Sequence, residues 1–217
     1  MAASWLLGID IGGTFTDAVA VEAETGTVRM RKVLTRSDPV ECIGAACDAL
    51  EIALSDFTDI MHGTTMATNA IVEGRLAPTA LIATEGFAEV LDIGRQNRRE
   101  LYKLSITARP EALVPRERRL EAQQRMDAAG AELVPLTEAE IARLADKVKK
   151  LGVESVAVAL IHSYMDGAHE ERIGAGLAGI VPYVALSHEL NPEPREFERT
   201  NSTVMNAALM PLVARYL

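Results

Sequence analysis

The sequence has little cysteine and no long apolar run, and both absences exclude classes of protein. Its 217 residues include two cysteines, Cys42 and Cys47. Their spacing in a helical pattern suits neither a disulfide framework nor a zinc site. We therefore expect both thiols to be reduced and buried, as is typical of a cytoplasmic protein. No apolar run approaches the roughly 18 residues of a membrane helix, so the sequence predicts no membrane segment.

Basic residues are also few relative to acidic ones. The chain has 22 lysines and arginines against 31 aspartates and glutamates, and its formal net charge is -9. A surface of this sign repels polyanions, so we expect neither nucleic acid nor an anionic membrane as a partner. Otherwise the composition is that of an ordinary globular protein, long enough to bury a core.

A Walker loop is missing, and so is a dinucleotide-binding loop. No Gly-Lys-Ser/Thr occurs, and the first glycine turn, Gly12-Gly13, is followed by a second strand and not by a helix. The apolar run at 5–11 predicts a buried strand before this turn. Strands at 15–22 and 27–34 follow, so the chain is expected to open as an antiparallel meander.

The rest of the chain alternates helices and strands. Asp38 caps a first helix that begins at Pro39, and Thr137 with Glu140 forms a capping box for a later one. Helices are predicted from 39 onward and at 65–73, 137–151, 167–180 and 195–217, the last with a break or kink near Pro211, and strands at 59–62, 79–83, 153–161 and 183–186. This order indicates a mixed α/β fold, in which ligands gather at the carboxyl ends of strands.

The first glycine turn carries the most specific chemistry. A strand brings Asp10 to its carboxyl end, and Gly12 and Gly13 lack the Cβ atoms that would keep backbone N–H groups from a phosphate. Thr14 and Thr16 add hydroxyl donors. Asp10 can face a phosphate when Mg²⁺ lies between them, directly or through a water. The alternative is a β-hairpin with a Gly-Gly turn and a solvated aspartate.

This strand–glycine turn–strand arrangement resembles the first phosphate loop of the actin/hexokinase/Hsp70 ATPase superfamily. The resemblance implies an α/β fold: a ribonuclease-H-like lobe with a mixed sheet flanked by helices, plus an inserted or adjoining α/β segment. We accordingly divide the chain into four parts. They are a phosphate-loop portion at 1–93, a basic excursion at 94–136, a second α/β portion at 137–190 and the start of a main body at 191–217.

Three further segments resemble the hydantoinase A/5-oxoprolinase family. They are His62-Gly63-Thr64-Thr65-Met66-Ala67-Thr68-Asn69-Ala70, then Thr84-Glu85-Gly86-Phe87 with Asp92-Ile93-Gly94-Arg95-Gln96-Asn97-Arg98, and then Arg195-Glu196-Phe197-Glu198-Arg199-Thr200 with Asn206-Ala207 and Pro211. With the phosphate loop they make four blocks in the family's order, over essentially the whole chain. One departure is Arg99, where the family often has proline.

Several side chains in these blocks are candidates for the substrate side of the site. They are His62, Thr64, Thr65, Asn69, Arg95 and Arg98. Neutral donors at a helix start suit an anion or a carbonyl group, and arginines bind carboxylate or phosphate through two hydrogen bonds. The alternatives are that the threonines only cap a helix and that the arginines are solvated. We interpret the cluster at 193–199 as ion pairs on a helix surface, and we assign no role to the other histidines.

The resemblance implies an ATP-dependent hydrolase of cyclic amides. Phosphorylating the carbonyl oxygen of an unstrained lactam creates a leaving group and lets water attack. On this hypothesis Asp10 holds Mg²⁺, and Asp17 is a weaker candidate for positioning the loop or a water. The ATP phosphates are held by Gly12, Gly13, Thr14 and Thr16. The alternatives are a subunit of an ATP-dependent acetone or acetophenone carboxylase, or a non-catalytic lobe that binds a nucleotide or a partner.

No second Gly-Gly pair occurs in the sequence. The superfamily places a second phosphate loop on a second lobe, so we expect that loop on a further part of the same polypeptide. The 217 residues alone are then expected to be inactive. Expected partners are a small cyclic amide, this further part of the chain and, as a further candidate, a hydantoinase B-like subunit.

Overall fold

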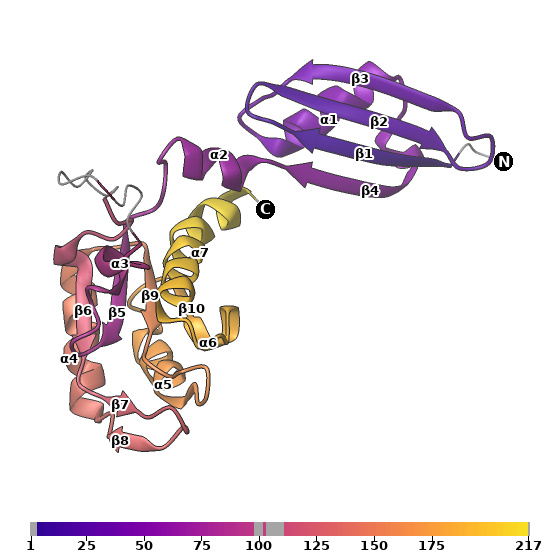
Figure 1. Ribbon diagram of the computed structural model, residues 1–217. Helices are drawn as coiled ribbons and strands as arrows, with labels where there is room; N and C mark the ends of the chain where they lie inside the picture. Colours follow the sequence, from indigo (N-terminus) through magenta and orange to yellow (C-terminus); the bar gives the residue numbers. More distant parts are fainter. Residues whose placement is uncertain (1–3, 98–101, 103–110, 217) are drawn as a thin grey trace. The chain divides into compact units, whose positions relative to one another are not determined.

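The fold is described from a computed structural model, for residues 4–97, 102 and 111–216. The chain forms two compact units, Met1–Leu76 with Leu212–Leu217 and Ala77–Pro211. Each unit has its own four-stranded sheet (Figure 1). The division falls at residue 76 and not at the expected residue 93, because the strand at Thr79–Thr84 pairs within the second sheet.

The first sheet has the strand order β3-β2-β1-β4. Its strands are β1 (Trp5–Ile11), β2 (Phe15–Glu22), β3 (Val28–Leu34) and β4 (Phe57–Thr64). The first three form the predicted antiparallel meander, whereas β4 pairs parallel with β1. The expected mixed sheet is therefore confirmed.

Helix α1 (Pro39–Leu50) packs against one face of this sheet. Asp38 caps it as predicted, since its carboxylate accepts a hydrogen bond from the Val40 N–H at 2.8 Å. The stripe of α1 that faces the sheet includes Cys42 and Cys47, which are buried and unpaired, as expected from their spacing. A 3₁₀ turn, η1 (Leu54–Asp56), leads into β4, and α2 (Met66–Val72) follows it.

The second sheet has the order β10-β9-β5-β6, and all its neighbouring strands are parallel. Its strands are β5 (Thr79–Thr84), β6 (Arg119–Ala122), β9 (Ser155–Ala159) and β10 (Tyr183–Leu186). Strand β6 comes from the segment expected to lie outside the core. It joins the sheet because Leu120 and Ala122 enter the buried cluster beneath α4 (Glu138–Leu151).

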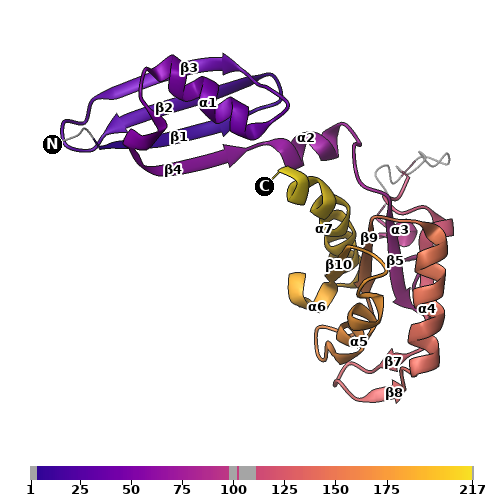
Figure 2. The ribbon, with the colours of Figure 1, turned by 180° about the vertical axis from the view of Figure 1, so that it is seen from behind.

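Helices cover both faces of the second sheet. Side chains of β5 alternate between α4 with α5 (Ala168–Leu177) on one face and α7 (Glu196–Tyr216) on the other. Figure 2 shows α4 and α7 on opposite sides of β5 and β9. Burial on two faces explains why these parallel strands have continuous apolar sequences. Helix α7 continues through Pro211, so the predicted break is absent.

The smaller elements of the second unit lie in its connections. They are α3 (Val90–Ile93), η2 (Arg116–Arg118), β7 (Arg125–Met126), β8 (Glu132–Val134) and α6 (Ser187–Leu190).

Only half of the predicted capping box is present. The Thr137 hydroxyl accepts from the Glu140 N–H at 3.2 Å, as predicted. The Glu140 carboxylate, however, accepts from the Gln123 N–H at 2.8 Å and from Arg143 Nε at 2.7 Å. The Glu140 carboxylate therefore links α4 to the end of β6 and does not complete the capping box.

Arg199 is fully buried, so the surface ion pair expected at 193–199 is wrong for this residue. Its guanidinium donates to the Leu160 carbonyl at 2.9 Å, to the Glu193 carbonyl at 2.7 Å and to the Ser187 hydroxyl at 3.1 Å, and it also pairs with Glu196. A sequence alone predicts that an arginine near the start of a helix is exposed to solvent. Here it joins α7 to the carboxyl ends of β9 and β10.

A buried carboxylate, Glu170, lies beside this arginine's partners. It accepts from the Leu160 N–H at 2.8 Å, the Ser187 hydroxyl at 2.6 Å and His188 Nδ1 at 2.9 Å. Burial opposes its ionisation, but the bonds from His188, Ser187 and the backbone outweigh burial and lower its pKa. Two histidines that received no role, His169 and His188, are thus structural, since His169 bonds Gln124 and Glu132.

We expect His188 to make the stability of the chain depend on pH. Its hydrogen bond to Glu170 raises its pKa above the usual 6.5, and Glu189 and Glu171 act in the same direction. A raised pKa stabilises the fold below the unfolded-state value, and this contribution is lost as the pH rises through the folded-state value. The free energy of unfolding should therefore fall above pH 6.5.

Urea titrations at several pH values check this expectation. The fall should be smaller for His188→Asn, which cannot take up the proton. Glu170 contributes in the opposite direction, because its lowered pKa matters only as the pH falls below the usual 4.5. Identical pH slopes for the wild type and the variant would contradict the assignment.

Candidate functional site

The phosphate loop and the segment at 62–69 meet at one edge of the first sheet. Because β1 and β4 are parallel, Asp10 lies beside Gly63 and Ile11 beside Thr64. The Thr64 hydroxyl donates to the Ile11 carbonyl at 3.3 Å. A Cβ on Gly13 would lie 3.5 Å from Asn69 Nδ2. Two sequence blocks that are fifty residues apart thus line the same edge, as the carboxyl ends of parallel strands do.

The backbone N–H groups of the glycine turn differ in whether they are already hydrogen-bonded within the turn. The Gly12 N–H donates to the Phe15 carbonyl at 3.1 Å, so it is used within the turn and cannot also bind a phosphate. Gly12 matters instead for space, since a Cβ there would lie 3.0 Å from the same carbonyl. In the described part of the chain, the N–H groups of Gly13 and Thr14 have no acceptor, and both residues are exposed.

Asp10 is exposed at the end of β1, directly across from Asp17 on β2. Lys32 Nζ lies 3.0 Å from the Asp17 carboxylate, whereas the Asp10 carboxylate has no ion pair or hydrogen bond among the described residues. Like charges directly opposite one another destabilise a sheet, so a cation beside Asp10 would be stabilising.

The residues at this edge fit a bound Mg²⁺ that shares its ligands with a nucleotide. Mg²⁺ is typically held by one or two carboxylates, with phosphate oxygens and waters completing its octahedron. Asp10 can supply such a carboxylate. Residues 4–97, 102 and 111–216 contain no group of three or more His, Cys, Asp or Glu side chains that could hold a metal by themselves.

The Thr16 hydroxyl is not available to a phosphate at the exposed side of the turn, contrary to the sequence prediction. Its side chain is fully buried, and its hydroxyl lies 3.0 Å from that of Thr35. Thr16 points to the α1 face because side chains alternate along β2. The prediction overlooked Thr35, which follows β3 and reaches the turn because Phe15 pairs with Leu34. The only sequence signal for it was that the meander brings the end of β3 beside the start of β2.

The remaining candidates of the first unit have partners within that unit. His62 Nε2 lies 2.9 Å from the Tyr216 hydroxyl, and the two rings stack with centroids 5.6 Å apart. The Thr64 hydroxyl also accepts from the Met66 N–H at 3.2 Å, which agrees in part with the capping alternative. The Thr65 hydroxyl accepts from Asn69 Nδ2 at 3.3 Å.

Of the two arginines predicted for the substrate side, the structure describes Arg95. Arg95 belongs to the second unit, where its Nε lies 2.5 Å from the Glu198 carboxylate. This ion pair lowers the pKa of Glu198. Arg98 lies outside the described residues.

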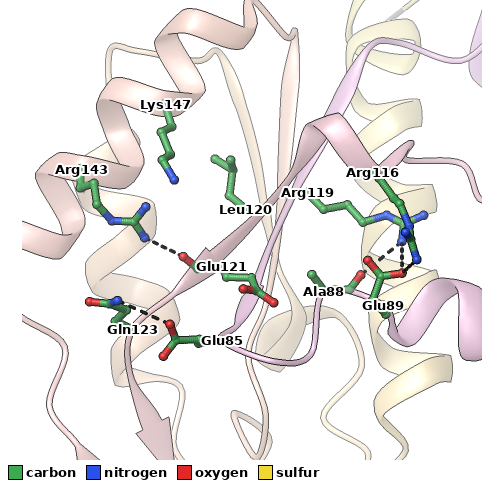
Figure 3. Close-up of a pocket in the computed structure, with 10 residues that line it drawn as sticks. All are labelled: Glu85, Ala88, Glu89, Arg116, Arg119, Leu120, Glu121, Gln123, Arg143 and Lys147. Atoms are coloured by element: carbon green, nitrogen blue, oxygen red, sulfur yellow. Dashed lines mark hydrogen bonds and ion pairs between the residues drawn. The ribbon is translucent and has the colours of Figure 1, made fainter.

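A charged cleft of about 540 Å³ lies in the second unit (Figure 3). Its arginines already have partners: Arg116 pairs with Glu89, Arg119 Nη1 lies 2.7 Å from Asp92, and Arg143 donates to the Glu121 carbonyl at 2.7 Å. The Arg119 hydrogen bond lowers the pKa of Asp92.

Figure 3 shows Arg143 reaching β6, the edge strand of this sheet. Charged side chains at an edge strand protect it from pairing with a further strand. We interpret the cleft as an ion-pair network and the edge of the first sheet as the candidate site.

Comparison with known proteins gives a consistent result. Residues 6–180 match the family described as the hydantoinase/oxoprolinase N-terminal region. An uncharacterized protein of Methanocaldococcus jannaschii is 38% identical, over 100% of this chain and 33% of its own length. The caprolactamase alpha subunit of Pseudomonas jessenii is 33% identical, over 97% of this chain and 32% of its own length.

The fold is also that of a solved relative. The crystal structure of the ATP-dependent caprolactamase from Pseudomonas jessenii superposes with a TM-score of 0.83 and 32% identity, over 97% of this chain and 32% of that chain. The present chain thus spans about a third of the length of the curated relatives it matches. Among its described helices, none is long and apolar enough to cross a membrane.

Proposed function

Since the chain belongs to the hydantoinase/oxoprolinase family, we propose that it forms the amino-terminal, phosphate-binding region of an ATP-dependent hydrolase of cyclic amides. The observation that carries the proposal is the edge of the first sheet, where two backbone N–H groups of the glycine turn and the carboxylate of Asp10 have no partner among the described residues. Solved and curated relatives named as caprolactamase support the substrate class.

The proposed reaction transfers the γ-phosphoryl group of ATP to the carbonyl oxygen of the lactam. Water then attacks the activated carbon and the ring C–N bond breaks, which leaves an acyl phosphate and a free amine. A second water hydrolyses the acyl phosphate to a carboxylate and inorganic phosphate. In phosphoryl transfer the protein mainly positions groups and neutralises charge. Mg²⁺ bound beside Asp10 would supply part of that neutralisation.

Each residue of the edge has a separate part in this proposal. The N–H groups of Gly13 and Thr14 bind a phosphate, and Thr14 can add its hydroxyl. Asp10 holds the metal. Asn69, above Gly13, and His62, held by Tyr216, are candidates for contacts to the nucleotide or the lactam.

We expect the second phosphate loop on a further part of the polypeptide, because the relatives are about three times as long. A second subunit is a further expectation, since one relative is named as an alpha subunit.

Phosphate release by the full-length protein tests the proposal. Mg-ATP is supplied with hydantoin, 5-oxoproline or caprolactam, and in a separate arm with acetone and bicarbonate; each arm is run with and without copurifying protein. Stimulation by a cyclic amide, but not by its ring-opened product, is expected. Stimulation only by the ketone with bicarbonate would contradict the hydrolase and favour the carboxylase alternative.

A further inference from the structure

Thr35 makes three hydrogen bonds to the phosphate loop, although no sequence block includes it. Its N–H donates to the Thr14 carbonyl at 3.0 Å. Its hydroxyl donates to the Gly12 carbonyl at 2.9 Å and lies 3.0 Å from the Thr16 hydroxyl. One residue at the end of β3 thus contacts three of the five residues from Gly12 to Thr16.

The direction of these bonds follows from counting protons. A hydroxyl has one proton to donate, and that of Thr35 goes to the Gly12 carbonyl, which can only accept. The contact between the two hydroxyls must then run from Thr16 to Thr35. Thr16 is fully buried, and this bond satisfies its donor. The result is a directed chain from Thr16 through Thr35 to Gly12, in which each bond polarises the next.

This chain fixes which way the peptide groups of the turn point. In a trans peptide the C=O and the following N–H point in opposite directions. Because Thr35 draws the Gly12 carbonyl toward β3, the Gly13 N–H points away from β3. The Thr14 carbonyl is held on the β3 side as well, so the carbonyl oxygens of Gly12 and Thr14 are both occupied by Thr35.

We propose that Thr35 is a positioning residue for phosphate binding, because its hydroxyl holds the Gly12–Gly13 peptide with its N–H free for the anion. The inference rests on the function proposed above and adds a residue to that site. Thr35 touches no reacting atom; it acts through the backbone of the loop. The backbone bond to Thr14 alone would continue the β2–β3 ladder, so the side chain is what distinguishes positioning from simple strand pairing.

The test uses the full-length protein with three substitutions. Thr35→Val removes the hydroxyl, and Thr35→Ser retains it. Thr58→Val is the matched control, because the Thr58 hydroxyl donates to the Trp5 carbonyl at 3.3 Å, at the opposite end of β1. Calorimetry measures the Kd for a non-hydrolysable ATP analogue with Mg²⁺, and thermal unfolding of each variant is followed in parallel.

Thr35→Val is expected to raise this Kd about tenfold, the effect of losing one hydrogen bond that orients a donor. Thr35→Ser should restore the wild-type Kd, and Thr58→Val should leave it unchanged even if its melting temperature falls as far as that of Thr35→Val. An unchanged Kd for Thr35→Val, or an equal rise for Thr58→Val, would overturn the inference and leave the proposed function intact. A wild-type protein that binds no Mg-nucleotide would overturn the proposed function itself.

Discussion

Replacing Asp10 by Asn in the full-length protein is expected to lower the rate of ATP turnover by roughly 10² to 10³-fold, the range for losing one preorganised electrostatic contact to a transferring group. The amide keeps the shape of the side chain but loses the charge that would hold Mg²⁺. Steady-state phosphate release with a cyclic amide measures the effect.

The same substitution should not weaken the fold. The Asp10 carboxylate has no partner among the described residues and lies opposite another carboxylate, that of Asp17. Removing its charge relieves a like-charge pair, so the free energy of unfolding should stay the same or rise. Asp17→Asn is the matched control. Because Asp17 is already paired with Lys32, we expect a smaller loss of turnover from it. Turnover at the wild-type rate in Asp10→Asn would refute the role of Asp10.

Replacing Arg199 by Ala is expected to lower the free energy of unfolding by about 3–5 kcal/mol, the usual effect of breaking a buried charged pair. The Leu160 and Glu193 carbonyls would each lose a hydrogen bond from the guanidinium, and the Leu160 carbonyl would keep the bond from the Ser163 N–H at 3.3 Å. It also pairs with Glu196, which would be left without its counter-charge. Urea unfolding monitored by circular dichroism measures the change.

Arg195→Ala is the control for this prediction. Arg195 is an exposed cation one helical turn before Arg199, and exposed substitutions usually change stability by less than about 0.5 kcal/mol. Equal losses for the two variants would show that Arg199 contributes only as an ordinary surface charge.

The sequence predicted those features that are set by local chemistry. Periodicity predicted most of the longer strands and helices, the caps at Asp38 and Thr137 are present, and the glycine turn lies between two strands as expected. These predictions are correct because a hydrophobic period, a helix cap or a turn depends only on residues that are close in the sequence.

Other features depend on which strands pair, and these the sequence could not supply. The pairing of β2 with β3 buries Thr16 and brings Thr35 to the loop, and the parallel pairing of β1 with β4 brings Asn69 over Gly13. The burial of Arg199 needs partners from three separate segments. The chemical type of one residue, such as a charged side chain near the start of a helix, does not reveal such long-range partners.

The most direct test of the phosphate site is a structure of the full-length protein with Mg²⁺ and a non-hydrolysable ATP analogue. We predict phosphate oxygens within hydrogen-bonding distance of the Gly13 and Thr14 N–H groups, with Mg²⁺ between the phosphates and Asp10. Phosphates bound elsewhere, for example in the charged cleft beside Arg143 and Lys147, would contradict the account.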